Sequence, residues 1–429
     1  MNILMCAEFF HPSIGGVQEV TKQLAMRFIL NGHSVTVATT AIPERLTSEF
    51  DGISVESFNI SGNYANGMNG EVARYKNFVK SEYFDLIFIY AAQQWTLDAL
   101  IHDLPNIKAK KVIVPCGFSG LYLDIYKNYY DLMPSILNKF DAVIFHSKDY
   151  RDYNFAVEKS IRNIIFIPNG ADNKEFSVQN SSFRFDQNIP EDVFLILTVG
   201  SLNGSKGHLE LAESMALLES SEKITLILNG NQNKQIFDFK ALILRFRTLN
   251  LLHLKILVKN VLHRIFLKSG LRVNYFSKLT QIIKEVNSGK HGSTKRIILL
   301  DLPRSKLVDC YFDSDLFVLA SNIEYSPLVL FEACAAGLPF LSVPVGNAME
   351  IAKWTGGGII CPANTTSNGN TMVNPKVLAD KINYLLKHRE ELKSLGSNGK
   401  KSWIEKFNWD SIAAMYEQTF LKVLANQKI

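Results

Sequence analysis

The sequence predicts an α/β fold built from two parallel-sheet domains, and three observations support this prediction. The chain of 429 residues is too long for one hydrophobic core and suits two domains of about 200 residues each. Apolar segments of strand length alternate with amphipathic segments of helix length, which is typical of parallel sheets with crossover helices. This alternation occurs twice, on either side of a polar stretch at residues 183–193.

The first series of elements forms the expected N-terminal domain, residues 1–182. Its strands are predicted at Ile3–Ala7, Ser34–Thr39, Leu86–Tyr90, Lys111–Val114, Ala142–His146 and Ile164–Ile167. Helices are predicted between them, for example at Val17–Asn31 and Trp95–Leu104. The polar stretch at residues 183–193 is expected to be an interdomain linker.

The second series forms the expected C-terminal domain, residues 194–407. Its strands are predicted at Phe194–Val199, Ile224–Asn229, Ile297–Leu300, Leu316–Ala320, Pro339–Val343 and Gly358–Ile360. Residues 408–429 contain an amphipathic segment, Trp409–Leu424, which is expected to be a closing helix.

A basic segment, residues 240–296, interrupts the second series and is expected to be a helical insert. It contains thirteen Lys and Arg residues against one acid, Glu285, which gives a net charge of +12. Since the whole chain carries +5, the rest of the chain carries −7. The basic character is therefore local and needs a local explanation.

The centre of this insert, LLHLKILVKNVLHRIFL, has the pattern of an amphipathic helix. Lys255, Lys259, His263 and Lys268 recur at near-helical spacing, and aliphatic residues and Phe fill the opposite face. No uncharged run approaches the ~20 residues that span a bilayer. The pattern favours a helix in the interface of an anionic membrane, with Lys255, Lys259, Arg264 and Lys268 facing the membrane. The alternative is a helix that packs on the C-terminal domain or on a partner subunit. Nucleic acid is disfavoured, because aliphatic rather than aromatic residues separate the cations.

Cysteine usage and the first residues indicate a cytoplasmic protein. The five cysteines are scattered without a C-x-x-C pair, so neither a disulfide framework nor a zinc site is indicated. The chain enters an apolar strand at once, without a basic region or a cleavage site, so we expect no secretion. We also expect no bound metal or other cofactor. Asp313-Ser314-Asp315 spells a D-x-D pattern, but it lies at a helix-to-strand junction, where acids are common turn residues.

The most informative motif is a pair of glutamates, Glu324 and Glu332. A turn, Tyr325-Ser326-Pro327, is expected between them, followed by a helix of small and apolar residues. The N–H groups of Leu328 and Val329 lie in the first turn of this helix, where they lack intrahelical acceptors and attract anions. Both carboxylates and these N–H groups are expected to face one spot. The alternative is an ordinary buried helix with two surface acids.

Glycine-rich turns follow three of the predicted strands. Gly15-Gly16 precedes a helix that carries Gln18 and Glu19 in its first turn. Glycines let the backbone approach a ligand closely, and the helix start offers N–H groups to an anion. The turn is not G-x-G-x-x-G, and no acid is placed to hold an adenosine ribose, so a dinucleotide cofactor is disfavoured. A plain strand-to-helix turn is the alternative.

The two other turns belong to the second series. After Val199-Gly200-Ser201, Lys206 stands at the start of the next helix, where a compact ammonium suits a diphosphate leaving group. The pair Asn229-Gly230 follows the next strand. A solvated loop lysine and an ordinary turn are the respective alternatives.

In this order the motifs resemble those of retaining GT-B glycosyltransferases of family 4, also called glycosyl transferases group 1. Glu324 to Glu332 resembles the E-x7-E motif, Gly15-Gly16 the N-terminal glycine loop, and residues 200–207 the G-R-L-x-x-x-K-G segment. The resemblance covers nearly the whole chain except the insert. It implies the GT-B fold, in which two Rossmann-like domains face a central cleft and the closing helix returns to the N-terminal domain.

The resemblance also implies roles for the residues of the donor site. Lys206 would neutralise the diphosphate with help from the N–H groups of Leu328 and Val329. Glu324 would bind sugar hydroxyls and Glu332 the nucleotide ribose. The donor site would further include Gly15, Gly16, Ser201, Asn229, Gly230, Ser326 and Pro327.

On the acceptor side the resemblance places Gln18, Glu19, Cys116 and Gly117 near the transferred sugar. Two residues depart from the family pattern. Ser201 occupies the place of an arginine, and Cys116 occupies roughly the place of a histidine close to the sugar. The two departures bear on turnover and on the sugar contact, whereas a reactive cysteine is disfavoured because no base neighbours it in sequence.

The expected function is a retaining glycosyltransferase that moves a sugar from a nucleoside diphosphate to a glycan or lipid-linked acceptor. We expect it at the cytoplasmic face of the membrane, in the assembly of cell-surface polysaccharide or glycolipid. A non-catalytic sugar-nucleotide-binding subunit of a glycan assembly complex is the first alternative, motivated by Ser201 and Cys116. A Rossmann oxidoreductase is the second, and the missing G-x-G-x-x-G argues against it.

Overall fold

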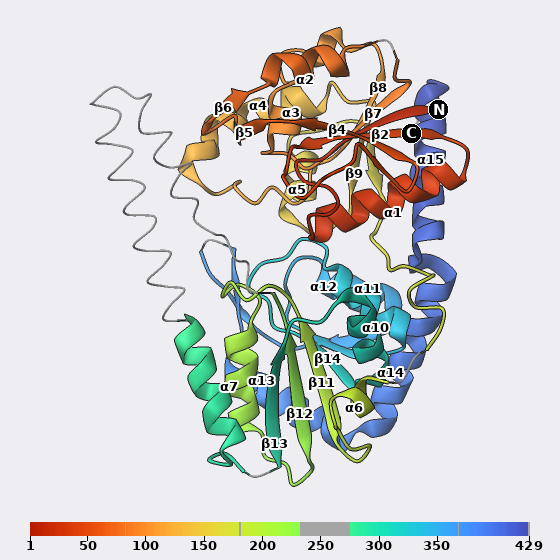
Figure 1. The fold of residues 1–429 in the computed structure, drawn as a ribbon. Coiled ribbons are helices and arrows are strands. Elements are labelled where there is room, and N and C mark those ends of the chain that lie inside the picture. The colour runs from red at the N-terminus through yellow and green to blue at the C-terminus, as the bar shows by residue number, and fades with distance from the viewer. Residues whose placement is uncertain (82, 180–181, 232–274, 293, 368, 428–429) are drawn as a thin grey trace.

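The structure is a computed structural model that describes residues 1–429 apart from 82, 180–181, 232–274, 293, 368 and 428–429. Two sheets lie in separate lobes, and the N-terminal lobe is the upper one in Figure 1. The predicted α/β class with two Rossmann-like parallel-sheet domains is therefore confirmed. Among the described residues, no helix is both long and apolar enough to cross a bilayer.

The sheet of the first domain has the strand order β10-β9-β8-β7-β1-β2-β4-β3. Its strands are β1 (Asn2–Cys6), β2 (Ser34–Thr40), β3 (Glu49–Phe50), β4 (Ile53–Phe58), β7 (Leu86–Tyr90), β8 (Lys110–Val114), β9 (Ala142–Phe145) and β10 (Ile164–Phe166). The pairs are parallel except for β3 with β4. The other elements of this domain are the hairpin β5 (Ile60–Asn63) and β6 (Gly67–Gly70), the helices α1 (Gly16–Leu30), α2 (Val72–Val79), α3 (Trp95–Asp98), α4 (Lys127–Leu137) and α5 (Arg151–Glu158), and the short helices η1 (Leu104–Asn106) and η2 (Asp124–Tyr126).

Two features of the first domain differ from the prediction. Strand β4 was not predicted, because its sequence Ile-Ser-Val-Glu-Ser-Phe mixes polar and apolar residues, although Ile53, Val55 and Phe58 are buried. The helix expected at Trp95–Leu104 stops at Asp98, and Pro105 lies in the separate short helix η1. Proline fits the first turn of a helix but not its interior, which agrees with this division.

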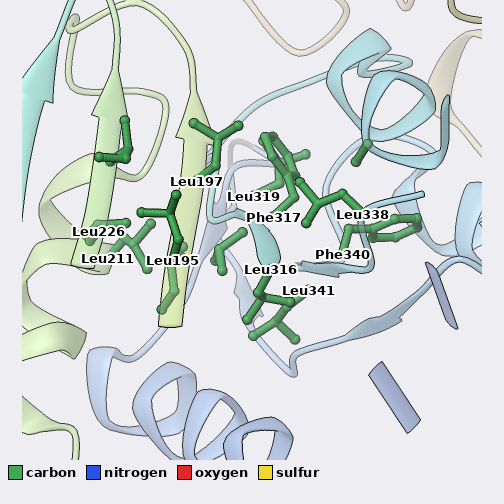
Figure 2. Close-up of a cluster of buried hydrophobic side chains, with 14 of the residues drawn as sticks. Leu195, Leu197, Leu211, Leu226, Leu316, Phe317, Leu319, Leu338, Phe340 and Leu341 are labelled. Atoms are coloured by element: carbon green, nitrogen blue, oxygen red, sulfur yellow. The ribbon is translucent and has the colours of Figure 1, made fainter. Parts of the chain in front are cut away.

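The sheet of the second domain has the order β13-β12-β11-β14-β15-β16, and its strand pairs are parallel. Its strands are β11 (Phe194–Val199), β12 (Ile224–Asn229), β13 (Lys295–Leu300), β14 (Leu316–Leu319), β15 (Phe340–Ser342) and β16 (Gly358–Ile360). The other elements are α6 (Phe183–Asp186), α7 (His208–Leu217), α10 (Arg304–Asp313), α11 (Leu328–Ala336), α12 (Ala348–Thr355), α13 (Pro375–Lys387), α14 (Arg389–Ser402), the hairpin β17 (Asn364–Thr365) and β18 (Thr371–Met372), and the π-helical turn η3 (Trp403–Phe407). Figure 2 shows the leucine and phenylalanine side chains of β11, β12, β14 and β15 packed together in the core.

The expected bounds of the basic insert need a correction at the C-terminal end. Residues 275–287 are helical, and Leu279 and Val286 of this helix belong to the core of the second domain. Lys295 and Arg296 already lie in β13. The sequence did not show that this helix belongs to the domain core, because it carries basic residues and buries few side chains. Lys255, Lys259, Arg264 and Lys268 lie outside the described residues.

The stretch at residues 183–193, expected as a linker, packs on the second domain. It contains α6, and Phe183, Ile189 and Val193 belong to the core cluster of that domain. Arg184 donates hydrogen bonds to Asp315 Oδ2 (2.8 Å) and to the backbone of Asp313 (3.0 Å). The D-x-D pattern at residues 313–315 thus holds the arginine of this stretch.

The C-terminal segment is helix α15 (Trp409–Leu424), which runs beside the first domain in Figure 1. Trp409, Tyr416 and Phe420 are buried in a cluster with Phe28 and Phe88 of that domain. The ring of Phe420 lies 5.4 Å from the ring of Phe28 and 5.6 Å from that of Phe88. The end of the chain therefore completes the core of the domain in which the chain began.

Candidate active site

The topology of the second sheet brings the loops after β11 and β14 together. These two strands are neighbours, with Leu197 paired to Phe317, although they are far apart in sequence. The order in which the strands are added reverses at this pair, since β12 and β13 lie on one side and β15 and β16 on the other. Ligands of open parallel sheets bind at such a switch point, beyond the carboxyl ends of the strands.

Lys206 follows β11 and Glu324 follows β14, and the two side chains meet at this point. The distance between Lys206 Nζ and Glu324 Oε1 is 2.6 Å, and the side chains are 25% and 16% exposed. The loop that carries Lys206 is closely packed. A Cβ on Gly207, which has φ +71°, would lie 2.0 Å from the carbonyl oxygen of Ala320, so a glycine is needed beside the lysine.

Helix α11 begins at Leu328, directly after Pro327, and ends at Ala336, where Gly337 caps it with φ +74°. The N–H groups of Leu328 and Val329 lie in its first turn, which has no intrahelical acceptors for them. Leu328 contacts the core cluster of the first domain, and Val329 contacts that of the second. The start of this helix therefore lies between the two domains. Ser326, just before it, has a buried hydroxyl with no hydrogen-bond partner in the described part of the chain.

Glu332 has different partners from Glu324. One oxygen lies 2.8 Å from Arg304 Nη2, and the other accepts a hydrogen bond from the hydroxyl of Tyr311 at 2.9 Å. Arg304 is also held by Glu175 at 2.6 Å. The side chain of Glu332 is only 9% exposed, so a bound ribose would have to form its hydrogen bonds with the small exposed part of the carboxylate. Sequence analysis did not single out Arg304 or Tyr311, although Pro303-Arg304 marks a helix start just beyond β13.

The other residues predicted for the donor site lie at the same edge of the sheet. Asn229 is buried, and its Oδ1 accepts a hydrogen bond from the N–H of Leu302 at 2.9 Å, so its side chain orders the loop after β13. A Cβ on Gly230 would lie 2.1 Å from the carbonyl oxygen of Gly200, so the two loops touch there. Ser201 is partly exposed, and its carbonyl oxygen accepts a hydrogen bond from the N–H of Asn203 at 2.8 Å.

On the first domain, Gly15 precedes α1 and the residues after it bond locally. A Cβ on Gly15 would lie 2.5 Å from the side-chain oxygen of Gln18, whose amide donates to the hydroxyl of Ser13 at 3.3 Å. Glu19 accepts hydrogen bonds from Lys22 (3.1 Å) and from Gln23 (2.7 Å). The carboxylate of Glu19 is therefore engaged along its own helix.

Cys116 and Gly117 lie after β8 with φ values of +60° and +87°. Burial raises the pKa of the Cys116 thiol to about 12, and the charge of Asp152 adds to this effect. The thiol is protonated at neutral pH, which agrees with the view that it is not a nucleophile. The N–H of Gly117 donates to Asp152 Oδ2 at 2.8 Å. A Cβ on Gly117 would lie 2.9 Å from the ring of Tyr325, so the second domain reaches this loop.

The first sheet has its own switch point between β1 and β7, which sequence analysis did not use. Glu8 follows β1, and Asp98 is buried at the end of α3, after β7. Burial raises the pKa of Asp98 to about 6. Burial, followed by the charge of Asp98, raises the pKa of Glu8 to about 7. Two carboxyl groups with high pKa values therefore lie at the crevice of the first domain.

An open pocket of about 730 Å³ lies elsewhere on the second domain. Its lining includes Gly337, Gly396, Lys400 and Glu405. It lies away from the switch point, and neither Lys206 nor Glu324 lines it. The chemistry of the paired loops, rather than cavity size, identifies the candidate site.

Comparisons with known proteins agree with this arrangement. The family model described as Glycosyltransferase Family 4 matches residues 14–175, and the one described as Glycosyl transferases group 1 matches residues 283–402. Together the two models cover more than half of the chain. The first match lies in the first domain, and the second match includes Glu324 and Glu332 of the second domain.

Two curated relatives were found. N-acetyl-alpha-D-glucosaminyl L-malate synthase of Bacillus anthracis is 31% identical over 115 residues, which are 27% of this chain and only 28% of that protein. An uncharacterised glycosyltransferase of Methanocaldococcus jannaschii is 23% identical and covers 96% of both chains.

Solved glycosyltransferase structures share the fold over nearly the full length. Sucrose-phosphate synthase from Thermosynechococcus elongatus has a TM-score of 0.69 and 17% identity, with 99% of this chain and 100% of that chain covered. HepE of Anabaena in complex with UDP has a TM-score of 0.67 and 17% identity, with 98% and 100% covered. WaaG, a glycosyltransferase involved in lipopolysaccharide biosynthesis, has a TM-score of 0.60 and 16% identity, with 98% and 99% covered. With its two matched family models and its two-domain fold, the chain belongs to the family 4 (group 1) type of glycosyltransferases and has the GT-B fold.

Proposed function

We propose that this protein transfers a sugar from a nucleoside diphosphate donor to a hydroxyl of a glycan or lipid-linked acceptor, with retention of configuration. The observation that carries the proposal is the 2.6 Å pair of Lys206 and Glu324 at the switch point of the second sheet. An ammonium and a carboxylate held together there match the two parts of a sugar nucleotide, an anionic diphosphate and a hydroxyl-rich sugar. The HepE complexes with UDP and UDP-glucose make uridine diphosphate sugars the first donors to test.

In this proposal Lys206 contacts the diphosphate without leaving Glu324. An ammonium has three N–H donors, so one can stay on the carboxylate while the others reach phosphate oxygens. The N–H groups of Leu328 and Val329 add donors from the start of α11. As the reaction proceeds, the bond between the anomeric carbon and the diphosphate oxygen breaks and its electron pair leaves with the diphosphate. The ammonium of Lys206 and the N–H groups at the start of α11 stabilise the negative charge that develops on the diphosphate.

The acceptor oxygen then bonds to the anomeric carbon on the same face, and its proton passes to a phosphate oxygen of the leaving group. No side chain is needed as a nucleophile in this scheme, and no metal is assigned a role. Glu324 would hold sugar hydroxyls through its free oxygen, and Glu332 would hold the ribose. The partners of Glu332, Arg304 and Tyr311, hold its carboxylate in one orientation.

The two glutamates give the experiment that tests these roles. Glu332→Ala should weaken binding of the nucleoside diphosphate by about 1.5–3 kcal/mol, the worth of a hydrogen bond to a charged group. Glu324→Ala should lower turnover while the affinity for the nucleoside diphosphate is nearly kept. Titration calorimetry and donor turnover measure the two effects. Equal affinities of wild type and Glu332→Ala would exclude the ribose role. Melting curves must accompany the titration, because Glu332→Ala leaves the buried Tyr311 hydroxyl without its acceptor.

A non-catalytic sugar-nucleotide-binding subunit is the second candidate, favoured by Ser201 in the place of the family arginine. A thermal-shift panel of UDP-, GDP-, ADP- and TDP-sugars identifies the ligand, since binding stabilises the folded state. Turnover of the stabilising donor then decides between the two: donor hydrolysis supports the enzyme, and binding without turnover supports the subunit.

We further propose that the protein works at the cytoplasmic face of a membrane, in the assembly of cell-surface polysaccharide or glycolipid. The sequence of the basic segment supports this proposal, because residues 240–274 hold eight Lys and Arg residues and no acid, interleaved with apolar residues. A lipid-linked acceptor would then be reached at the surface to which the protein binds.

A further inference from the structure

Tyr325 directly follows Glu324, and its side chain enters the first domain. Its ring centroid lies 5.2 Å from that of Tyr150 and 5.5 Å from that of His146. Gly117 provides the space, since a Cβ there would lie 2.9 Å from the Tyr325 ring and 3.2 Å from Tyr150. The second domain therefore places an aromatic side chain in a socket of the first domain, one residue from the predicted sugar-binding carboxylate.

The hydroxyl of Tyr325 is bonded within this socket. It accepts a hydrogen bond from the N–H of His146 at 3.0 Å. The buried carboxylate of Asp152 accepts hydrogen bonds from the N–H groups of Gly117 (2.8 Å) and Tyr153 (2.9 Å). A buried carboxylate with several donors is well fixed, so the loop of Gly117, which borders the Tyr325 ring, is held in place.

The wall of the socket is rigid as well. His146 is fully buried, with Nδ1 2.7 Å from the carbonyl oxygen of Ile167 and Nε2 2.7 Å from the hydroxyl of Tyr90. Burial lowers the pKa of His146 to about 4, so the imidazole is neutral. A carbonyl can only accept, so Nδ1–H donates to Ile167 and Nε2 accepts from Tyr90. The carbonyl oxygen of His146 accepts from the Asn347 side chain at 2.9 Å.

Two more hydrogen bonds hold the main chain beside Glu324. The hydroxyl of Tyr150 donates to the carbonyl oxygen of Glu324 at 2.8 Å. The N–H of Asn347 donates to the carbonyl oxygen of Tyr325 at 2.9 Å. The backbone on both sides of the Glu324–Tyr325 peptide is therefore tied, and the first tie comes from the acceptor-side domain.

We propose that Tyr325 is a positioning residue, which fixes the carboxylate of Glu324 relative to the first domain through its ring contacts and through the hydrogen bond that its hydroxyl accepts from the N–H of His146. This inference rests on the proposed transfer reaction. The donor is bound mainly by the second domain and the acceptor by the first, so a residue that joins the two at Glu324 aligns the sugar with the acceptor. It acts on the reaction step and contributes little to binding of the nucleoside diphosphate.

The test compares Tyr325→Phe and Tyr150→Phe with wild type. Tyr325→Phe keeps the ring and removes the hydroxyl, so kcat should fall about tenfold while the Kd of the nucleoside diphosphate stays within about twofold. Tyr150→Phe, which frees the carbonyl oxygen of Glu324, should lower kcat in the same way. Tyr384→Phe is the matched control, because this tyrosine is 40% exposed and its hydroxyl donates to Glu391 at the surface of α13 and α14.

An unchanged kcat in Tyr325→Phe would overturn the proposal. Amide hydrogen exchange provides a readout that does not need turnover. Residues 324–326 should exchange faster in Tyr325→Phe than in wild type, with β11 and β12 unchanged. Faster exchange in a protein that turns over no donor would leave the structural role intact and contradict only the proposed reaction. Unchanged exchange at residues 324–326 would contradict the positioning role itself.

Discussion

Some residues of the candidate site could be predicted from the sequence, and others could not. The spacing from Glu324 to Glu332 and the glycines around Lys206 predicted a common edge, and the structure brings Lys206 to Glu324. Such positions follow local rules for strand ends and helix starts. Arg304 and Tyr325 were not singled out, because their partners lie far away in sequence and no local pattern encodes those contacts.

Glu8 allows a test at this scale through its pKa of about 7, which lies above the ordinary value of 4.5. A carboxyl with a raised folded pKa contributes stability below the unfolded pKa, and this stability is lost as the pH rises to about 7. Glu8→Gln removes that loss. The variant should therefore gain melting temperature over wild type at about pH 8, and gain less at about pH 5.

Glu158→Gln serves as the control for this measurement, since the Glu158 side chain is 71% exposed. Its melting temperature should follow wild type at both pH values. A gain by Glu8→Gln that does not depend on pH would show that the carboxyl of Glu8 titrates normally in the folded protein.

At the scale of elements, strands with continuous apolar sequence were predicted closely, since burial on both faces leaves a clear pattern. The observed β11 and β7 coincide with the predictions. Strand β4 and the glycine-containing hairpin of β5 and β6 were missed, because partial exposure breaks the apolar pattern. The end of the basic insert was misplaced for a similar reason, since only Leu279 and Val286 of the helix at residues 275–287 are buried.

The basic insert makes the prediction that belongs to this scale. The protein should sediment with anionic liposomes and not with neutral ones, because the cations of the insert are attracted to anionic lipid. Binding should weaken as salt rises, since exposed charges are screened within ~8 Å at physiological salt, and the apolar face should leave a salt-resistant remainder. Changing Lys255, Lys259, Arg264 and Lys268 to Glu should abolish the sedimentation. Equal sedimentation of wild type and this variant would favour a protein partner for the insert.

At the scale of the whole molecule, the domains are joined at several places. Helix α15 places the end of the chain in the core of the first domain. The loops around Tyr325 and Asn347 bind the first domain at His146. The two-domain architecture followed from chain length and from the repeated alternation of elements, and it is confirmed. The closeness of the domains at Tyr325 could not be predicted, because a domain interface leaves no periodic signal in the sequence.

The central claim is that Lys206 and Glu324 form the site of a nucleoside diphosphate sugar. Titration calorimetry of wild type and Lys206→Met with the preferred nucleoside diphosphate tests it most directly. Methionine keeps the length of the side chain and removes the charge. The affinity should fall about tenfold or more, as expected when a charge-assisted contact to phosphate is lost, and the loss should be smaller for the nucleoside monophosphate. Lys223→Met, at a lysine that is 60% exposed, should bind like wild type. Equal affinity of Lys206→Met and wild type for the diphosphate would contradict the claim.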